Sequence, residues 1–333
     1  MKWLLRIAGT LVAVLVIAFL IFRTPDTDAA AMRAKYGGAP SQFVEIEGGV
    51  SVHLRDEGPR DGANLPIILL HGSNADLHTW EPWVKGLSST HRVIRFDQVG
   101  HGLTGPDPAG DYSRANYASD VIEVADALGI ERFILGGNSM GGKHTLAAAF
   151  EYPERVAGLI LVDAGGMPDV GADDEGDDGG NIGFTIARMP GINRIAQQIT
   201  PRSLIEQSLE QSVSVKSVVT KEAVDRYWEL LRYPGNRAAT MARFSSPYEP
   251  LSFDEIAQIA APSLIIWGDE DRLIPLAAGE ALDKTLPDSE LVIFEGIGHL
   301  PHEEAAQDTL NAVTKWLLNP KFTTQPAENS DQS

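Results

Sequence analysis

Apolar runs and segments of helical period alternate along most of the chain. Residues 43–46 and 50–54 alternate between apolar and polar positions on either side of a Gly-Gly pair, which predicts a β-hairpin. The later runs do not alternate, as expected for strands buried on both faces of a parallel sheet. These mostly apolar runs are residues 66–70, 92–96, 133–135, 159–162, 263–267 and 291–294.

Helical segments separate these runs. Residues 117–128 place Val121, Val124 and Leu128 on one helical face. Strands that alternate with helices imply right-handed crossovers, and therefore an α/β fold with a mostly parallel central sheet flanked by helices. In such a sheet, reactive groups belong on the loops at the carboxyl ends of the strands.

The alternation breaks in the middle of the chain. Residues 168–250 are mostly helical in period and contain Pro190, Pro201 and Pro234, which predicts a helical cap inserted into the domain. The core of the domain is then expected in two pieces, residues 41–167 and 251–320. We expect residues 321–333 to form a disordered tail.

The amino terminus differs from the rest. Residues 1–22 are nearly all apolar and contain Lys2 and Arg6, which favours a membrane anchor over a cleaved signal segment. Residues 23–40 read as a linker. The expected location is therefore a membrane-anchored protein with an exported catalytic domain, periplasmic or extracellular, and the alternative is secretion after signal cleavage. The only membrane partner expected is the bilayer around this helix.

Composition limits the classes of function. The chain of 333 residues has a formal net charge of −19, which argues against nucleic acid as a partner. It has no cysteine, so disulfides, thiolate metal sites and cysteine nucleophiles are excluded. No metal or organic cofactor is expected. The acidic residues 169–178 are interpreted as a solvated loop, with a cation site or lid edge as the alternative.

One motif stands between a predicted strand and a predicted helix. Residues 137–141 read Gly-Asn-Ser-Met-Gly, a G-x-S-x-G pattern with Ser139 at its centre. A serine at such a sharp turn holds its hydroxyl clear of both elements. Gly137 and Gly141 lack Cβ atoms, so the strand and the helix can approach closely. The N–H of Met140, at a helix amino terminus, suits an oxyanion.

Further motifs follow other strands in a consistent order. They are His71-Gly72, residues 97–102, Trp267-Gly268-x-x-Asp271 and Gly298-His299. Together with the serine motif, and in this order, they resemble the α/β-hydrolase superfamily, over about residues 50–318. The resemblance implies a triad of Ser139, Asp271 and His299. It also implies an oxyanion hole formed by the N–H groups of Ser73 and Met140. Asp269 and His302 are the rivals for the acid and the base.

The resemblance implies hydrolysis through an acyl-enzyme, with a small-molecule ester or related acyl compound as substrate. Carboxylic ester hydrolysis is the main expectation. The segment around Ser139 also looks like the meta-cleavage-product hydrolases, which cut carbon–carbon bonds. The residues after His71-Gly72, however, depart from the Gly-Pro-Gly usual there. Lactonase activity stays open, as does a non-catalytic ligand-binding protein on the same scaffold. The sequence leaves the oligomeric state undetermined.

Overall fold

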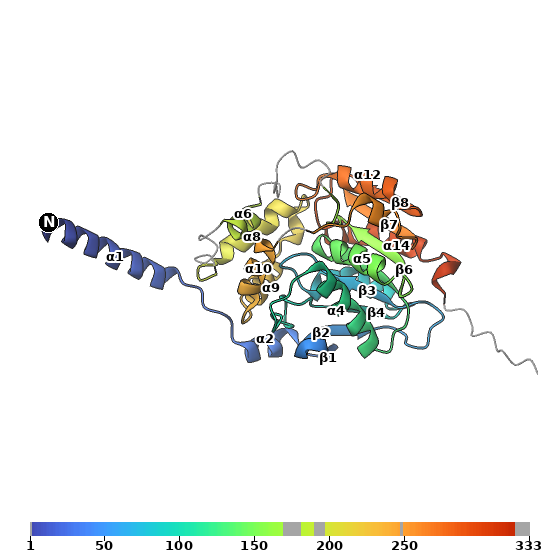
Figure 1. Ribbon diagram of the computed structural model, residues 1–333, viewed down its shortest axis with the longest axis horizontal. Coiled ribbons are helices and arrows are strands. Elements are labelled where there is room, and N and C mark those ends of the chain that lie inside the picture. Colours follow the sequence, from blue (N-terminus) through green and yellow to red (C-terminus); the bar gives the residue numbers. More distant parts are fainter. Residues whose placement is uncertain (1, 169–180, 190–196, 247–248, 324–333) are drawn as a thin grey trace, which may run out of the picture.

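The structure, a computed structural model, describes residues 2–168, 181–189, 197–246 and 249–323 (Figure 1). Within these residues an 8-stranded sheet has the order β1-β2-β4-β3-β5-β6-β7-β8. β1 and β2 pair antiparallel, as do β2 and β4, and the other neighbours are parallel. The predicted α/β fold is therefore confirmed. The strands are β1 (Ser41–Ile46), β2 (Val50–Glu57), β3 (Ile67–Leu70), β4 (Val93–Phe96), β5 (Phe133–Asn138), β6 (Val156–Val162), β7 (Ser263–Gly268) and β8 (Ser289–Phe294).

The central strands are apolar without alternation because helices cover both faces of the sheet. In β3, Ile68 and Leu70 belong to one core cluster, while Ile67 and Leu69 belong to another. Side chains of a strand point alternately to opposite faces, so both faces here are buried. The first cluster includes residues of α4 (Arg114–Ala127), α5 (Met140–Glu151) and α12 (Leu276–Thr285), and the second includes residues of α3 (Glu81–Leu87) and α14 (Ala306–Trp316).

A group of helices occupies the interval predicted as a cap. They are α6 (Ile182–Arg188), α8 (Arg202–Ser212), α9 (Lys221–Leu231) and α10 (Asn236–Ser245), and they lie together beside the sheet in Figure 1. Shorter helical turns complete the described chain: η1 (Glu47–Gly49), η2 (Leu77–Trp80), η3 (Lys216–Val218), α11 (Phe253–Ile256), α13 (Pro301–Glu304) and η4 (Pro320–Phe322). The acidic residues 169–178 lie outside the described residues.

The amino-terminal prediction requires a correction. Residues 2–22 form a helix, α1 (Lys2–Phe22), that projects away from the domain in Figure 1. In the part of the chain that the structure describes, no helix is both long and apolar enough to cross a membrane. A span needs about 20 mainly apolar residues, whereas Lys2, Arg6 and Thr10 confine the uninterrupted apolar run of α1 to residues 11–22. This finding contradicts the predicted transmembrane anchor, the membrane partner and the anchored, exported location.

The predicted linker packs against the cap. We call residues 23–36 the amino-terminal strap; it ends in α2 (Ala29–Tyr36). The Thr24 N–H donates to the carbonyl of Gln198, and the Thr27 N–H donates to that of Arg232, both at 2.8 Å. The strap is therefore hydrogen-bonded to the cap and is more than a connection between elements.

The carboxyl end of the described chain packs on the sheet. The predicted tail begins at residue 321, but Phe322 is buried in the same core cluster as Ile67 and Leu69 of β3. The Leu65 N–H donates to the Phe322 carbonyl at 2.9 Å, and Thr323 forms a β-bridge with Asn64. Residues 324–333 lie outside the described part of the chain.

Candidate active site

Ser139 lies at a sharp turn between β5 and α5. Its φ of 55° and ψ of −118° are strained for a residue with a side chain, as a nucleophile elbow requires. Close packing forces glycine on both sides of the turn. A Cβ on Gly137 would lie 2.3 Å from the backbone of Gly141, and one on Gly141 would lie 2.3 Å from the Leu70 carbonyl oxygen. The serine is thus held at the carboxyl end of a central strand.

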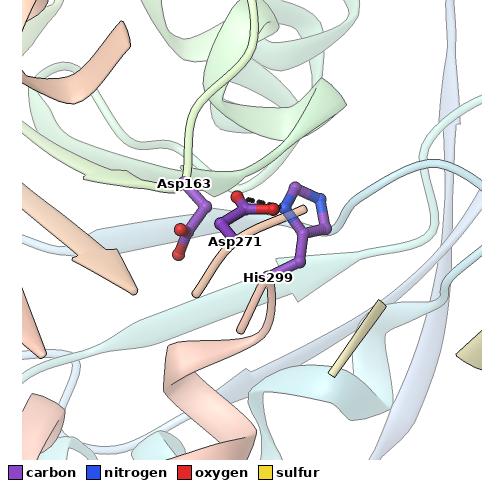
Figure 2. Close-up of side chains that lie close together, drawn as sticks. All are labelled: Asp163, Asp271 and His299. Atoms are coloured by element: carbon purple, nitrogen blue, oxygen red, sulfur yellow. Dashed lines mark hydrogen bonds and ion pairs between the residues drawn. The ribbon is translucent and has the colours of Figure 1, made fainter. Parts of the chain in front are cut away.

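His299 and Asp271 form a hydrogen-bonded pair. His299 Nδ1 lies 2.7 Å from Asp271 Oδ2 (Figure 2), and the two residues are 5% and 8% exposed. The other carboxylate oxygen, Oδ1, accepts hydrogen bonds from the backbone N–H groups of Leu273 and Ile274, at 2.8 and 3.1 Å. The carboxylate is therefore oriented by three donors. Among the described residues, no hydrogen bond joins the Ser139 hydroxyl to His299, although both residues line the same cavity.

The rival residues have other partners. The Asp269 carboxylate accepts the backbone N–H of Gly296 at 2.7 Å, in an exposed position. His302 is fully buried against the Trp80 ring, with ring centroids 4.3 Å apart, and its Nε2 lies 2.8 Å from the Thr79 hydroxyl. Burial lowers the pKa of His302 to about 3, so this imidazole is neutral and structural.

A network of buried hydrogen bonds holds the loop that carries Ser73. His71 is buried, its Nδ1 donates to the Gly72 carbonyl at 2.8 Å, and its Nε2 accepts the N–H of Gln98 at 3.0 Å. The Gln98 side chain in turn donates to the His71 carbonyl and accepts from His144 Nδ1, each at 2.6 Å. A Cβ on Gly72 would lie 3.3 Å from that of Ser139. The network thus holds the Ser73 backbone next to the serine elbow.

A cation from the cap contacts both residues whose N–H groups are expected in the oxyanion hole. The Arg243 guanidinium, on α10, donates to the Ser73 hydroxyl at 3.1 Å and contacts Met140 Sδ at 3.0 Å. It also reaches Asn74 Oδ1 and Thr240 Oγ1, both at 3.3 Å. Burial lowers the pKa of Arg243. Within the described residues it forms no ion pair.

The cavity at Ser139 lies between the core and the cap. Its volume, with its open mouth, is about 1020 Å³. Asn74, Ser139 and His299 line its floor, and Ile205 and Tyr227 line it from the cap. Arg237 of α10 also lines it, and its guanidinium pairs with Asp26 of the amino-terminal strap at 2.6 Å. The strap therefore supports one wall of the cavity.

Two residues of the site escaped the sequence interpretation. Arg243 is one arginine in a helical segment, and nothing local distinguishes it from a solvated side chain. Asp163 lies directly after β6, completely buried, beside Asp271 and His299 (Figure 2). The sequence does contain a pattern that indicates Asp163, because it is an acidic residue directly after a predicted buried strand. These three side chains also form the one group in the described chain with atoms spaced to hold a metal, but its histidine nitrogen is already hydrogen-bonded to Asp271.

Comparison with known proteins defines the class of the chain. The model of the α/β-hydrolase fold family matches residues 66–306, and so the chain belongs to that family. It is therefore an enzyme of the α/β-hydrolase superfamily, as the motifs predict.

Among its relatives, the 2-hydroxy-6-oxononadienedioate/2-hydroxy-6-oxononatrienedioate hydrolase of Comamonas testosteroni is 32% identical over 289 residues, covering 82% of this chain and 94% of the relative. The meta-cleavage product hydrolase CumD of Pseudomonas fluorescens IP01 has a TM-score of 0.71 and 25% identity, covering 84% of this chain and 97% of that one. A thermophilic esterase of Thermogutta terrifontis has a TM-score of 0.69 and 26% identity, covering 85% and 100%. The first two of these relatives favour the carbon–carbon hydrolase alternative over the main expectation of ester hydrolysis.

Proposed function

We propose that this enzyme hydrolyses a carbon–carbon bond next to a ketone in 2-hydroxy-6-oxo-dienoate substrates. The relatives support this class of substrate, since the Comamonas enzyme is named for such a compound. The observation that carries the proposal is Arg243, a partly buried cation beside the cavity. It contacts Ser73, which lines the cavity, its Nε is buried without a hydrogen-bond partner, and it has no acidic partner among the described residues. A buried charge without a counter-ion is unfavourable. A substrate carboxylate supplies the missing negative charge.

In this proposal Ser139 Oγ adds to the 6-oxo carbon while His299 takes its proton and Asp271 stabilises the imidazolium. The N–H groups of Ser73 and Met140 bind the oxyanion. Before this addition the dienol tautomerises: the 2-hydroxyl loses its proton, C5 gains one, and C2 becomes a ketone conjugated with the C3=C4 double bond. After the addition the C5–C6 bond breaks, and its electron pair passes through C3=C4 to the C2 oxygen. His299 returns the proton to the leaving dienolate. Water, activated by His299, releases the carboxylic acid from Ser139.

The residues that line the cavity suggest different roles for the cap and the core. The cap, which we assign to residues 168–250, supplies apolar side chains such as Ile205 around the substrate chain. Arg237, which lines the cavity, and Arg243, which contacts Ser73 beside it, both come from α10, so one helix of the cap supplies the positive charge. We infer that the cap selects the substrate and that the core carries the reaction.

The test is a substrate panel. Purified enzyme should cleave 2-hydroxy-6-oxo-6-phenylhexa-2,4-dienoate or 2-hydroxy-6-oxononadienedioate, with loss of the dienol absorbance and release of the acid. Ser139→Ala should lower kcat by at least ~10³-fold.

Arg243→Gln should raise KM for these anions about 10–100-fold, since hydrogen bonds to charged groups contribute about 1.5–3 kcal/mol.

The controls separate charge recognition from folding. Arg243→Gln should change KM for the neutral ester p-nitrophenyl acetate much less than KM for the dienoates. Arg202→Gln removes an arginine of α8 that pairs with Asp225 and does not line the cavity, and it should leave both activities unchanged. Equal loss on the anionic and neutral substrates would contradict the assigned role of Arg243.

Carboxylic ester hydrolysis is the second candidate. Two observations favour it: the similarity to the Thermogutta esterase, and the loop Ser73-Asn74-Ala75-Asp76 in place of the Gly-Pro-Gly element. Turnover of p-nitrophenyl esters with a clear preference for one acyl length, and no cleavage of any dienoate, would select this candidate over the first.

A further inference from the structure

Two aspartates from neighbouring strands lie near the imidazole of His299, and Asp271 is the one that contacts it. Asp163 follows β6 and Asp271 follows β7, and the two strands are parallel, with Val162 opposite Ile266. Because the carboxyl ends of parallel strands meet at one edge of the sheet, both side chains arrive at the same place (Figure 2). One oxygen of each carboxyl group and one ring nitrogen of His299 all lie within 4.8 Å of one another.

The two carboxyl groups are bonded unequally. Asp271 accepts three hydrogen bonds, from His299 and from the N–H groups of Leu273 and Ile274. Asp163 accepts one, at 3.1 Å from the N–H of Gly268, and its Oδ2 is buried with no partner among the described residues. The carboxylate that accepts more hydrogen bonds is the one stabilised in its charged form, and so the negative charge of the pair belongs on Asp271.

Asp163 is therefore neutral in the resting enzyme. Burial first, then the negative charge of Asp271 and a hydrogen-bonding interaction with its carboxylate, raise the pKa of Asp163 well above its usual range. Other groups act on it from the elements around it. Glu304 on α13 raises its pKa further, and the Gly268 N–H lowers it. Removing the charge of Asp271 would remove the largest electrostatic cause of this shift.

A purely structural role accounts for part of these contacts. Asp163 has a φ of 40°, which aspartate and asparagine tolerate better than most residues, and its Oδ1 joins β6 to the end of β7. Asparagine would do both. What that role leaves unexplained is why the position holds an acid, whose Oδ2 is fully buried beside the pair of Asp271 and His299 without a geometric hydrogen-bond partner among the described residues.

We propose that Asp163 is a second acid for His299, a positioning residue that takes over the hydrogen bond to Nδ1 when Asp271 cannot carry the charge. The inference rests on the catalytic role of His299 in the proposed function, but not on the carbon–carbon bond as substrate. Only a proton and a hydrogen bond change place in the exchange. Asp163 releases its proton to solvent, and its carboxylate accepts the Nδ1–H that Asp271 held.

The experiment compares Asp271→Asn, Asp163→Asn and the double variant with wild type. Activity is measured as kcat/KM on p-nitrophenyl acetate, so the result stands even if no dienoate is cleaved. Loss of a triad acid alone lowers kcat about 10⁴-fold in a comparable triad. Asp271→Asn should therefore lose only about 10–100-fold at pH 8, Asp163→Asn less than about 3-fold, and the double variant the full ~10⁴-fold. Asp269→Asn is the matched control on the same loop and should match wild type.

Two further readouts distinguish a working acid from a packing residue. The acid limb of the pH profile should move to higher pH in Asp271→Asn, because a buried carboxyl with a raised pKa replaces Asp271. In proton NMR, the low-field His299 Nδ1–H signal should persist in Asp271→Asn and disappear in the double variant. Equal losses in Asp271→Asn and the double variant would overturn the proposal. If Asp163→Asn fails to fold, absence of the NMR signal in Asp271→Asn would overturn it without that variant.

Discussion

At the scale of single residues, burial keeps several ionisable side chains of this protein neutral. It lowers the pKa of His71, His101 and His144, which lie around the loop that carries Ser73. Their imidazoles therefore act as fixed hydrogen-bonding groups and do not add charge near Ser73. The charged groups identified near Ser139 are then Asp271, Arg237 and Arg243, together with any charge of the substrate.

Asp120, on α4, gives a test of such burial away from the site. It is 7% exposed, and burial, followed by the charge of Glu123, raises its pKa to about 8. The unfolded chain releases this proton near pH 4, so the folded state binds more protons between pH 4 and 8. The free energy of unfolding contributed by Asp120 must then fall as pH rises through this window, and level off above about pH 8.

Asp120→Asn should therefore stabilise the protein increasingly from pH 5 to pH 8, by about 2 kcal/mol or more at pH 8. At pH 4 the two proteins should have the same stability. Urea denaturation at a series of pH values measures the difference. Asp308→Asn, at an exposed position of α14, is the control and should show no such trend. A constant difference across the pH range would show that Asp120 is already ionised when folded.

At the scale of elements, the amino-terminal strap and α10 are coupled. The Arg237 guanidinium donates to the Thr24 carbonyl at 2.9 Å and to Asp26 at 2.6 Å, and the same side chain lines the cavity. The strap also bonds to the carbonyl of Arg232 through Thr27. Because these contacts join segments about 200 positions apart, loss of the strap affects the cap directly.

Deletion of residues 2–32 should therefore destabilise the cap and raise KM several-fold, while deletion of residues 2–22 should leave both stability and KM near those of the full chain. Each hydrogen bond contributes about 0.5–1.5 kcal/mol, so the longer deletion should lower the free energy of unfolding by about 2–4 kcal/mol. Thermal denaturation and steady-state kinetics on one substrate measure the two effects. Identical behaviour of the two deletions would show that the strap contacts contribute nothing.

At the scale of the whole molecule, Phe322 links the carboxyl-terminal part of the described chain to the core of the sheet. Its ring packs 4.3 Å from that of Trp316, with 1% of the residue exposed. A Cβ on Gly158 of β6 would lie 2.6 Å from the Phe322 ring, so the aromatic side chain fills the space that this glycine leaves. Phe322 thereby completes the core on one face of the sheet.

Phe322→Ala should lower the free energy of unfolding by about 3–5 kcal/mol, the usual effect of removing a buried aromatic side chain. The cavity at Ser139 does not include Phe322, so kcat of the folded enzyme should stay within about 2-fold of wild type. Urea denaturation and activity at low temperature give the two values. Phe253→Ala changes an exposed phenylalanine and should have little effect on either. A large loss of kcat without loss of stability would contradict this assignment.

The local parts of the fold could be predicted from the sequence. Runs such as residues 66–70 are apolar without alternation because both faces of a parallel strand are covered, and this is a property of neighbouring residues. The elbow at Ser139 is equally local, since Gly137 and Gly141 are required within two positions of the serine. Such reasoning is wrong at the amino terminus, where an apolar segment with charges near its start predicts a full span that the described helix does not provide.

The sequence by itself determined the α/β architecture, the position of Ser139 at a strand end, and the motifs that place Asp271 and His299 after later strands. Periodicity and turn chemistry act over a few residues and can be read there. Only the tertiary structure decided that Asp163 lies beside Asp271, that Arg243 reaches Ser73 across 170 positions, and that the strap and Phe322 close the molecule. Those contacts depend on how distant segments pack, and burial then sets which of the side chains carry charge.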